Sequence, residues 1–434
     1  MTKFYRDLVI LALLITMGSC AAPAAKQPTQ QSNAKSTLSP TAPPEPTILP
    51  DLAIVRHPAA ADFSAYFPQI TSTPKFDPAS TDPFQVDLRS QDLTGIDMTA
   101  SLADLLYATF DSKTQWPSSN EMPAGFDWQK FMETGKDPGL GLRSLHDDGF
   151  TGKGVGIAII DQTLLVDHIE YRDQLQLYEE INVLPDSEAA MHGVAVTSIA
   201  VGKTVGVAPE ADLYYIATGF CGAETFEELD FACWAKAVRR IVKINENLPA
   251  DRKIRVLSMS WGWSTKSTGY KQISAAVNEA KAAGIFVISS SLGHTDELYF
   301  QGLGRLPLDD PNRFESYTPG LWWEKDYFAD PLNYYFGNLP EPLLLVPMDS
   351  RTTASPTGAE DYVFYRIGGW SWSIPYLAGT YALAVQIDPD ITPEEFWETA
   401  LETGRTTQIQ HDGREYEFGV ILNPQALITA VRSQ

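Results

Sequence analysis

The distribution of apolar and polar residues divides the chain into regions. Residues 1–20 contain an apolar run from Leu8 to Met17, and residues 21–50 are rich in Ala, Pro, Ser, Thr and Gln. The second composition cannot bury a core, so we expect a flexible linker there. Residues 51–144 return to a globular composition, with short strand and helix segments near 87–89 and 102–106. A regular alternation of strands and helices begins at residue 145 and extends to 434.

The region 145–434 predicts a three-layer α/β/α fold with a mostly parallel sheet, preceded by an N-terminal extension. Residues 155–160 form a nearly continuous apolar run, which is typical of a parallel strand buried on both faces. Further strands are expected at 213–217, 254–260 and 285–291, and helical faces at 234–241 and 273–280. Thr392-Pro393-Glu394-Glu395 has the capping box and proline of a helix start. Ligands bind beyond the carboxyl ends of such strands, where Asp161 stands.

Between residues 292 and 367 this pattern is lost, and aromatic residues and prolines dominate, as in 321–323 and 333–336. We expect a long, ordered insertion beside the site. Its aromatic clusters serve either packing or the binding of a substrate or partner.

Residues 368–379 predict a tight loop that leads into a buried helix. The pair Gly368-Gly369 permits a sharp turn, and Pro375 suits a first helical turn. Small residues at 378, 382 and 384 then allow close packing. Ser371 would lie at the helix N-terminus, where free N–H groups and the helix dipole favour negative charge. A nucleophilic serine that creates an oxyanion needs such a place, but it also needs a base. By itself the loop serves packing equally well.

Length and charge limit the class of protein. A chain of 434 residues predicts two domains, or one large domain with extensions. A formal net charge of −23 disfavours nucleic acid as a partner, because phosphate binding needs a basic face.

The first twenty residues are typical of a targeting segment, with Lys3 and Arg6 before the apolar run and Gly18-Ser19-Cys20 after it. The segment resembles a bacterial lipoprotein signal with Cys20 as the lipidated residue. The alternative is an ordinary secretory signal with an incidental cysteine. The first interpretation predicts an extracytoplasmic protein of the cell envelope, anchored to a membrane by lipid. The run is too short to span a bilayer, and nothing later is apolar for long enough.

Two further cysteines, Cys221 and Cys233, lie twelve positions apart. In an exported chain they form either a disulfide or two separate buried thiols. Two cysteines at this spacing do not make a metal site.

The candidate base is His192, at the start of a small-residue stretch from Met191 to Ala200. A lone histidine in such a place is usually structural. Together with an aspartate after a buried strand and a serine at a helix start, however, it suggests nucleophilic catalysis, in which a carboxylate orients the base.

Five segments, taken in order, resemble the subtilisin-like serine peptidases, or subtilases. They are Gly152 to Asp161 with His168, His192-Gly193 with Gly206-Val207-Ala208-Pro209, Leu257 to Gly262, Gly369 to Gly379, and Phe418 to Asn423. The resemblance covers residues 145–434. It implies a serine endopeptidase with Asp161, His192 and Ser371 as its triad. Ser260, Trp261 and Gly262 would bind the peptide substrate as an added strand.

The sequence departs from the family pattern around the serine and in the oxyanion hole. Trp370, Trp372 and Ile374 replace the usual Thr, Met and Ser, and Val194-Ala195 replace the usual Thr-His. The family asparagine that donates to the oxyanion is absent, so Gly293 and His294 are the tentative substitutes. Loss of such a donor slows the reaction about 10²- to 10³-fold.

These departures motivate a second hypothesis, a catalytically weak or inactive subtilase-fold protein that binds or scaffolds at the cell surface. Neither hypothesis needs a cofactor. The resemblance allows a structural calcium ion, but no residue pattern assigns ligands to it. The sequence leaves open the substrate, and whether residues 51–144 are a propeptide, an accessory domain or a packed extension.

Overall fold

The computed structural model describes residues 52–433, apart from Tyr66, Thr81, Pro83, 222–228 and 332–342. The signal segment with Cys20, the linker 21–50 and the aromatic stretch 333–336 therefore lie outside the described residues.

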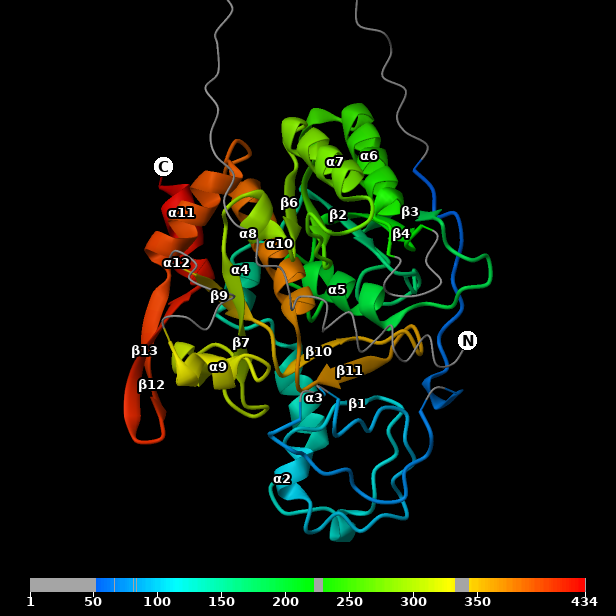
Figure 1. The fold of residues 1–434 in the computed structure, drawn as a ribbon, viewed down its shortest axis with the longest axis vertical. Coiled ribbons are helices and arrows are strands. Elements are labelled where there is room, and N and C mark those ends of the chain that lie inside the picture. The colour runs from blue at the N-terminus through cyan, green and yellow to red at the C-terminus, as the bar shows by residue number, and fades with distance from the viewer. Residues whose placement is uncertain are drawn as a thin grey trace, which may run out of the picture.

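The centre of the molecule is a five-stranded parallel sheet (Figure 1). Its strand order is β3-β4-β2-β5-β6, so the chain crosses the sheet repeatedly through helices. The strands are β2 (Gly156–Asp161), β3 (Leu175–Ile181), β4 (Asp212–Thr218), β5 (Ile254–Met259) and β6 (Phe286–Ser289). All residues of β2 and β6 are buried, as their apolar runs predict.

Helices cover both faces of this sheet, which confirms the predicted three-layer α/β/α fold. On one face lie α6 (Ala232–Asn247) and α7 (Tyr270–Ala282), and on the other α5 (Met191–Val201) and α10 (Trp370–Ile387). Alternate residues of β2 serve the two faces: Ala158 and Ile160 join the α6 and α7 core, while Ile157 and Ile159 join the α5 and α10 core. The same alternation directs Asp161 toward α5 and α10.

The sequence prediction missed strand β3 and made β6 too long. β3 contains Gln176, Glu179 and Glu180, which break the apolar run because this strand lies at the sheet edge and is only half-buried. Beyond β6, the Ser290 N–H donates to the carbonyl oxygen of Trp261 at 3.1 Å, and the chain turns into α8 (Leu292–Thr295).

The described parts of the insertion, residues 292–331 and 343–367, contain regular structure that the sequence analysis did not predict. Its strands are short and lie between long loops, which hides their period. They are β7 (Phe300–Arg305), β8 (Tyr317–Pro319), β9 (Leu344–Pro347), β10 (Arg351–Ala354) and β11 (Tyr362–Tyr365), with helix α9 (Glu324–Ala329). β7, β8 and β9 join the C-terminal hairpin of β12 (Arg405–His411) and β13 (Arg414–Ile421) in a second five-stranded sheet.

Two helices complete the C-terminal part. α11 (Pro393–Thr403) begins at the predicted capping box, where the Glu395 N–H donates to the Thr392 hydroxyl at 3.2 Å. α12 (Pro424–Arg432) packs on α10 and α11.

The N-terminal region packs against the α/β domain (Figure 1, blue and cyan). It contains α2 (Leu102–Leu105), β1 (Phe110–Asp111), α3 (Trp128–Lys136) and α4 (Leu142–Asp147), and α4 crosses the predicted boundary at residue 145. β1 pairs antiparallel with β11 through Phe110 and Phe364, so this region completes a sheet with the insertion. Residues 87–89 form no strand, and Asp87 makes only an isolated bridge with Thr109.

Candidate active site

Asp161 and His192 meet at the carboxyl end of the parallel sheet. Asp161 is the last residue of β2, and His192 is the second residue of α5. Asp161 Oδ1 lies 2.7 Å from His192 Nδ1, and both side chains are buried. A carboxylate at this distance fixes the imidazole with its proton on Nδ1, so Nε2 faces the site as a proton acceptor.

The glycine after His192 explains how the helix approaches the strand so closely. A Cβ atom at Gly193 would lie 2.7 Å from the carbonyl oxygen of Gln162, the residue that follows Asp161. The Tyr215 hydroxyl, which hydrogen-bonds to that same oxygen, would lie closer still. A larger residue would push the start of α5 away from the end of β2, and with it His192 away from Asp161.

Ser371 lies at a helix N-terminus, as predicted, but the helix begins earlier than expected. α10 begins at Trp370, so Pro375 lies inside the helix, and the prediction that it occupies the first turn is wrong. The reason is visible in the hydrogen bonds. Pro375 has no N–H to donate to the Ser371 carbonyl oxygen, and the Ser260 hydroxyl donates to that oxygen instead, at 2.9 Å.

In this structure the serine hydroxyl is hydrogen-bonded to a backbone oxygen and not to the histidine. Ser371 Oγ donates to the carbonyl oxygen of Ser260 at 3.3 Å, whereas the buried His192 Nε2 has no hydrogen-bond partner among the described residues. Exposed fractions are 0% for Asp161, 3% for His192 and 4% for Ser371, so the site is closed to solvent. All three side chains are buried, but among the described residues only Asp161 and His192 are joined by a hydrogen bond, and none joins Ser371 to His192.

Two tryptophans border His192. The Trp372 ring lies edge-on, with its centroid 5.9 Å from that of the imidazole, and the Trp261 ring is 6.3 Å away. Both tryptophans are buried. Trp261 is part of the predicted substrate strand, but the contact of Trp372 with His192 depends on how α5 and α10 pack and has no local signal in the sequence.

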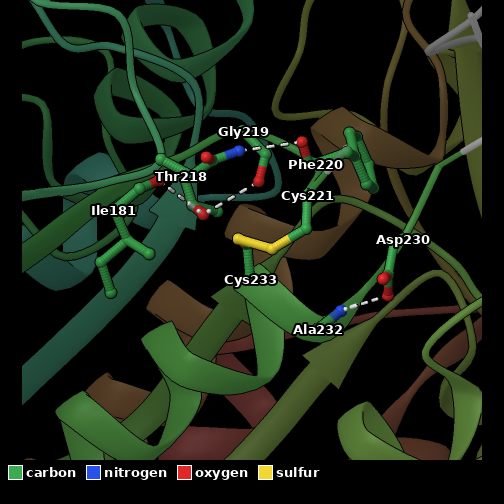
Figure 2. The surroundings of a disulfide bond; sticks show 9 residues. Ile181, Thr218, Gly219, Phe220, Cys221, Asp230, Ala232 and Cys233 are labelled. Carbon is green, nitrogen blue, oxygen red and sulfur yellow. Dashed lines mark hydrogen bonds between the residues drawn. A yellow bond between two sulfur atoms is a disulfide. The ribbon is translucent and has the colours of Figure 1, made fainter. Parts of the chain in front are cut away.

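A disulfide lies next to the aromatic residue that packs against Trp261. The structure joins Cys221 to Cys233, the second residue of α6, with their Cα atoms 5.4 Å apart; this is the first of the two alternatives left open by the sequence (Figure 2). Phe220, next to Cys221, packs edge-on against Trp261 with ring centroids 4.9 Å apart. The disulfide thus fixes the aromatic side chain that supports Trp261.

The tentative oxyanion residues are not gathered at the site. Gly293 and His294 lie in the short helix α8, and the His294 side chain is exposed. No contact joins His294 to Ser371 or His192 within the described parts of the chain. The Ser371 N–H is better placed, because the second residue of a helix has no intrahelical acceptor for its N–H group.

His168, part of the segment that contains Asp161, has a structural role. Its Nε2 lies 2.9 Å from the Asp361 carbonyl oxygen, and its Nδ1 accepts the Glu170 N–H at 3.2 Å. Burial lowers the pKa of His168, which keeps the ring neutral.

Within the part of the chain that the structure describes, no group of three or more His, Cys, Asp or Glu side chains is arranged to hold a metal ion. We therefore assign no calcium ligands. Among the helices of the same part, none combines the length and apolar character needed to cross a bilayer.

Residues 152–323 match the profile of the subtilase family. A curated relative, the serine protease AprX of Bacillus subtilis (strain 168), is 25% identical over 308 residues, which is 62% of this chain and 65% of that protein. The match thus spans less than two thirds of the relative's length.

Two solved structures are also similar. The prenylagaramide maturation protease PagA is 16% identical with a TM-score of 0.44, and the alignment covers 67% of this chain and 98% of that one. A cold-adapted subtilisin-like serine proteinase is 16% identical with a TM-score of 0.40, covering 58% and 83%. The fold assignment accordingly rests on the strand order and helix placement described above.

The family match includes Asp161 and His192 and ends before Ser371. The serine is therefore assigned from its place at the start of α10 and its contacts with Ser260. Residues 152–323 are thus similar to the subtilase family, and the parallel sheet with helices on both faces agrees with that similarity.

Proposed function

We propose that the protein is a serine endopeptidase that hydrolyses peptide bonds with Asp161, His192 and Ser371. The observation that carries the proposal is the 2.7 Å hydrogen bond between Asp161 and His192, beside a serine at a helix N-terminus. An unpartnered His192 Nε2 supports it further, since a buried acceptor without a donor is costly to keep. The Ser371 hydroxyl would supply that donor if it rotated from the Ser260 carbonyl oxygen toward His192.

In the proposed reaction, Ser371 Oγ attacks the carbonyl carbon of the scissile bond, and His192 Nε2 takes the serine proton. Asp161 holds the Nδ1 proton and stabilises the imidazolium that forms. The oxygen of the tetrahedral intermediate accepts from the Ser371 N–H at the start of α10. His192 then protonates the leaving amine, and water hydrolyses the acyl-serine with His192 again as base.

Two changes prepare this chemistry. The Ser371 hydroxyl must turn from the Ser260 carbonyl oxygen toward His192, and the closed site must open to a peptide. Catalytic hydrogen bonds are often long or unformed without substrate, so this arrangement is compatible with catalysis. Trp261 and Trp372 leave little room beside His192, so we propose a restricted substrate range, which a peptide library would measure.

The missing family asparagine makes the proposed enzyme slow. Because the His294 side chain is exposed and makes no hydrogen bond to Ser371 among the described residues, the oxyanion would rely on the Ser371 N–H and on donors brought by substrate binding. Loss of one such donor costs about 10²- to 10³-fold in rate.

Labelling with a fluorophosphonate probe tests the proposal, because the probe reacts with a serine that an adjacent base activates. Full-length protein should be labelled, and the labelled peptide should contain Ser371. Ser371→Ala and His192→Ala should both abolish labelling. Labelling that survives Ser371→Ala would refute the assignment. A folded protein that is never labelled would favour the alternative, a non-catalytic binding or scaffolding protein.

We also propose that lipid on Cys20 anchors the protein on the outer side of a cell membrane. The support is the arrangement of basic, apolar and small residues before Cys20. Metabolic labelling with a fatty acid should mark the wild-type chain and not Cys20→Ala; equal labelling of both would exclude this anchor.

A further inference from the structure

Asp349 is a buried carboxylate in the turn between β9 and β10, and its exposed fraction is 2%. Its two oxygens hold two segments that are distant in sequence. Oδ1 accepts the Gly368 N–H at 2.8 Å, and Oδ2 accepts the Leu321 N–H at 2.9 Å. Gly368 lies in the loop that leads to Ser371, and Leu321 precedes Trp322 in the insertion.

The two segments meet at Trp370, the residue before the nucleophile: Gly368 leads to it along the chain, and the segment after Leu321 packs against it. The Trp322 ring packs edge-on against Trp370, with centroids 5.7 Å apart, and Trp322 Nε1 donates to Met348 Sδ at 3.2 Å. The Trp370 Nε1 group donates to Gln301 Oε1 on β7. Trp370 therefore packs against the insertion, and Asp349 connects the insertion at Leu321 to the nucleophile loop at Gly368.

The loop at Gly368 packs closely against the turn that contains Asp349. A Cβ atom at Gly368 would lie 2.5 Å from the Met348 carbonyl oxygen, so the loop backbone lies directly on the residue before Asp349. The backbone of Asp349 is itself fixed, since its N–H donates to the Leu303 carbonyl oxygen of β7 at 3.0 Å. A shift of the Asp349 carboxylate would thus be transmitted to Gly368 and along the chain to Ser371.

We propose that Asp349 is a positioning residue for the nucleophile, which holds the Gly368 and Leu321 segments together and so sets the place of Ser371 relative to His192. Its catalytic consequence rests on the proposed function of Ser371, whereas its hold on the two segments does not.

The charge state of Asp349 matters to this role. Burial is the main cause that raises the pKa of Asp349, to about 6; Arg366 and the two N–H donors partly oppose this rise, and Glu324 of α9 adds to it. Arg305 of β7 is also close, because it donates to the carbonyl oxygen of Ser350 at 2.8 Å. An ionised carboxylate accepts at both oxygens, but a protonated one turns one oxygen into a donor. Protonation of Asp349 therefore weakens one of its two hydrogen bonds, to the Gly368 N–H or to the Leu321 N–H.

Amide hydrogen exchange on the full-length protein tests the hold directly. Asp349→Asn keeps the size of the side chain but offers one acceptor oxygen. Exchange in peptides that cover 319–323 or 366–372 should become roughly tenfold faster, as expected for one lost charge-assisted hydrogen bond. In the wild type the same peptides should loosen between pH 7.5 and 5.5, after correction for intrinsic rates. This second measurement needs no variant, so it still decides the matter if Asp349→Asn does not fold.

Glu170→Gln is the matched control. Glu170 is also a buried carboxylate that accepts a backbone N–H, that of Thr204 at 2.8 Å, and it also accepts the Tyr362 hydroxyl at the start of β11, but among the described residues it makes no hydrogen bond to 319–323 or 366–372. This variant should leave exchange at 319–323 and 366–372 unchanged. Unchanged exchange in Asp349→Asn, or equal loosening in both variants, would overturn the proposal.

Fluorophosphonate labelling across pH 5 to 9 then reports the catalytic consequence. Asp349→Asn should slow the labelling of Ser371 about 10- to 100-fold at pH 8, and its decline toward acid pH should be less steep than in the wild type, because one titrating group is gone. Glu170→Gln should keep the wild-type pH profile. Wild-type rate and profile in Asp349→Asn would overturn the role of Asp349. Absence of labelling in the wild type, by contrast, would refute the proposed function, while the exchange data would still decide whether Asp349 holds the loop.

Discussion

Arg89 offers the sharpest test of how the N-terminal region is joined to the α/β domain. Its guanidinium is buried, with Nη2 2.7 Å from Asp87 Oδ2 and Nε 2.9 Å from Asp87 Oδ1. Four aromatic rings surround it at 4.8 to 5.7 Å, from Phe63, Phe67, Phe84 and Tyr365. The first three rings belong to the N-terminal region, and Tyr365 belongs to β11. We consider the change Arg89→Met, which keeps an unbranched, apolar side-chain stem but removes the charged guanidinium.

Removal of one partner from a buried ion pair costs about 3–5 kcal/mol, because the other charge remains without compensation. Asp87 keeps 17% side-chain exposure, which allows some hydration, so we expect the lower end, about 3 kcal/mol. The cation–π contacts are part of this truncation cost, so we do not add them. At about 2.1 cal/mol/K per residue, a cooperative unit of roughly 380 residues has an unfolding entropy near 0.8 kcal/mol/K, and Tm should fall by about 4 °C.

Differential scanning calorimetry on wild type and variant measures this shift and also shows whether the regions unfold together. A single transition that moves to lower temperature is expected, because β1 and β11 share a sheet and Arg89 joins both regions. Arg313→Met is the control, since Arg313 is 67% exposed and lies 3.7 Å from Glu315; such surface pairs are worth about 0–1 kcal/mol. A shift in Arg89→Met no larger than in this control would refute the reasoning. A separate early transition would show that the N-terminal region unfolds on its own, as a removable propeptide would.

Three further changes test the site. Gly379→Ala would place a Cβ atom 2.6 Å from Val207 Cβ, between α10 and the chain after α5. Overpacking costs about 1–3 kcal/mol and the higher helix propensity of alanine returns about 1 kcal/mol, so urea unfolding should show a net loss of stability. An unchanged urea midpoint would contradict the close contact. Cys233→Ser opens a loop of 12 residues and should destabilise by about 2–3 kcal/mol, with slower fluorophosphonate labelling; stability equal to wild type under oxidising conditions would argue against the disulfide. Asp161→Asn should lower the labelling rate about 10³- to 10⁴-fold at pH 8 with little change in stability, and a rate near that of wild type would remove Asp161 from the proposed triad.

Much of the central fold was predictable because burial on both faces leaves a direct mark on the sequence. Strands β2 and β4 are apolar runs, and α11 begins at a capping box whose atoms lie within four residues of each other. Strand β3 has no such mark, since an edge strand needs only partial burial. The strands of the insertion were missed for another reason. They are short, and some of them pair with partners far along the chain, such as β9 with β13 and β11 with β1, so no local pattern encodes that pairing.

The candidate site divides in the same way. Asp161, His192 and Ser371 were found because each stands at the end of a strand or the start of a helix. The roles of Pro375 and Asp349 were not predictable, because each depends on contacts between segments that are distant in sequence. Pro375 leaves a carbonyl oxygen for Ser260, and Asp349 connects Gly368 to Leu321. The exposure of His294 was likewise set by the turn after β6, which the sequence placed inside a strand.

The two tryptophans beside His192 are supported by two separate parts of the chain. Trp261 rests on Phe220, which the disulfide holds in place, and Trp372 packs edge-on against Tyr365, with ring centroids 5.2 Å apart. Tyr365 is the residue against which Arg89 of the N-terminal region packs. The surroundings of the imidazole therefore depend on a covalent bond on one side and on a docked N-terminal region on the other. If the proposed triad is active, loss of either support should change its reactivity while Asp161, His192 and Ser371 remain intact.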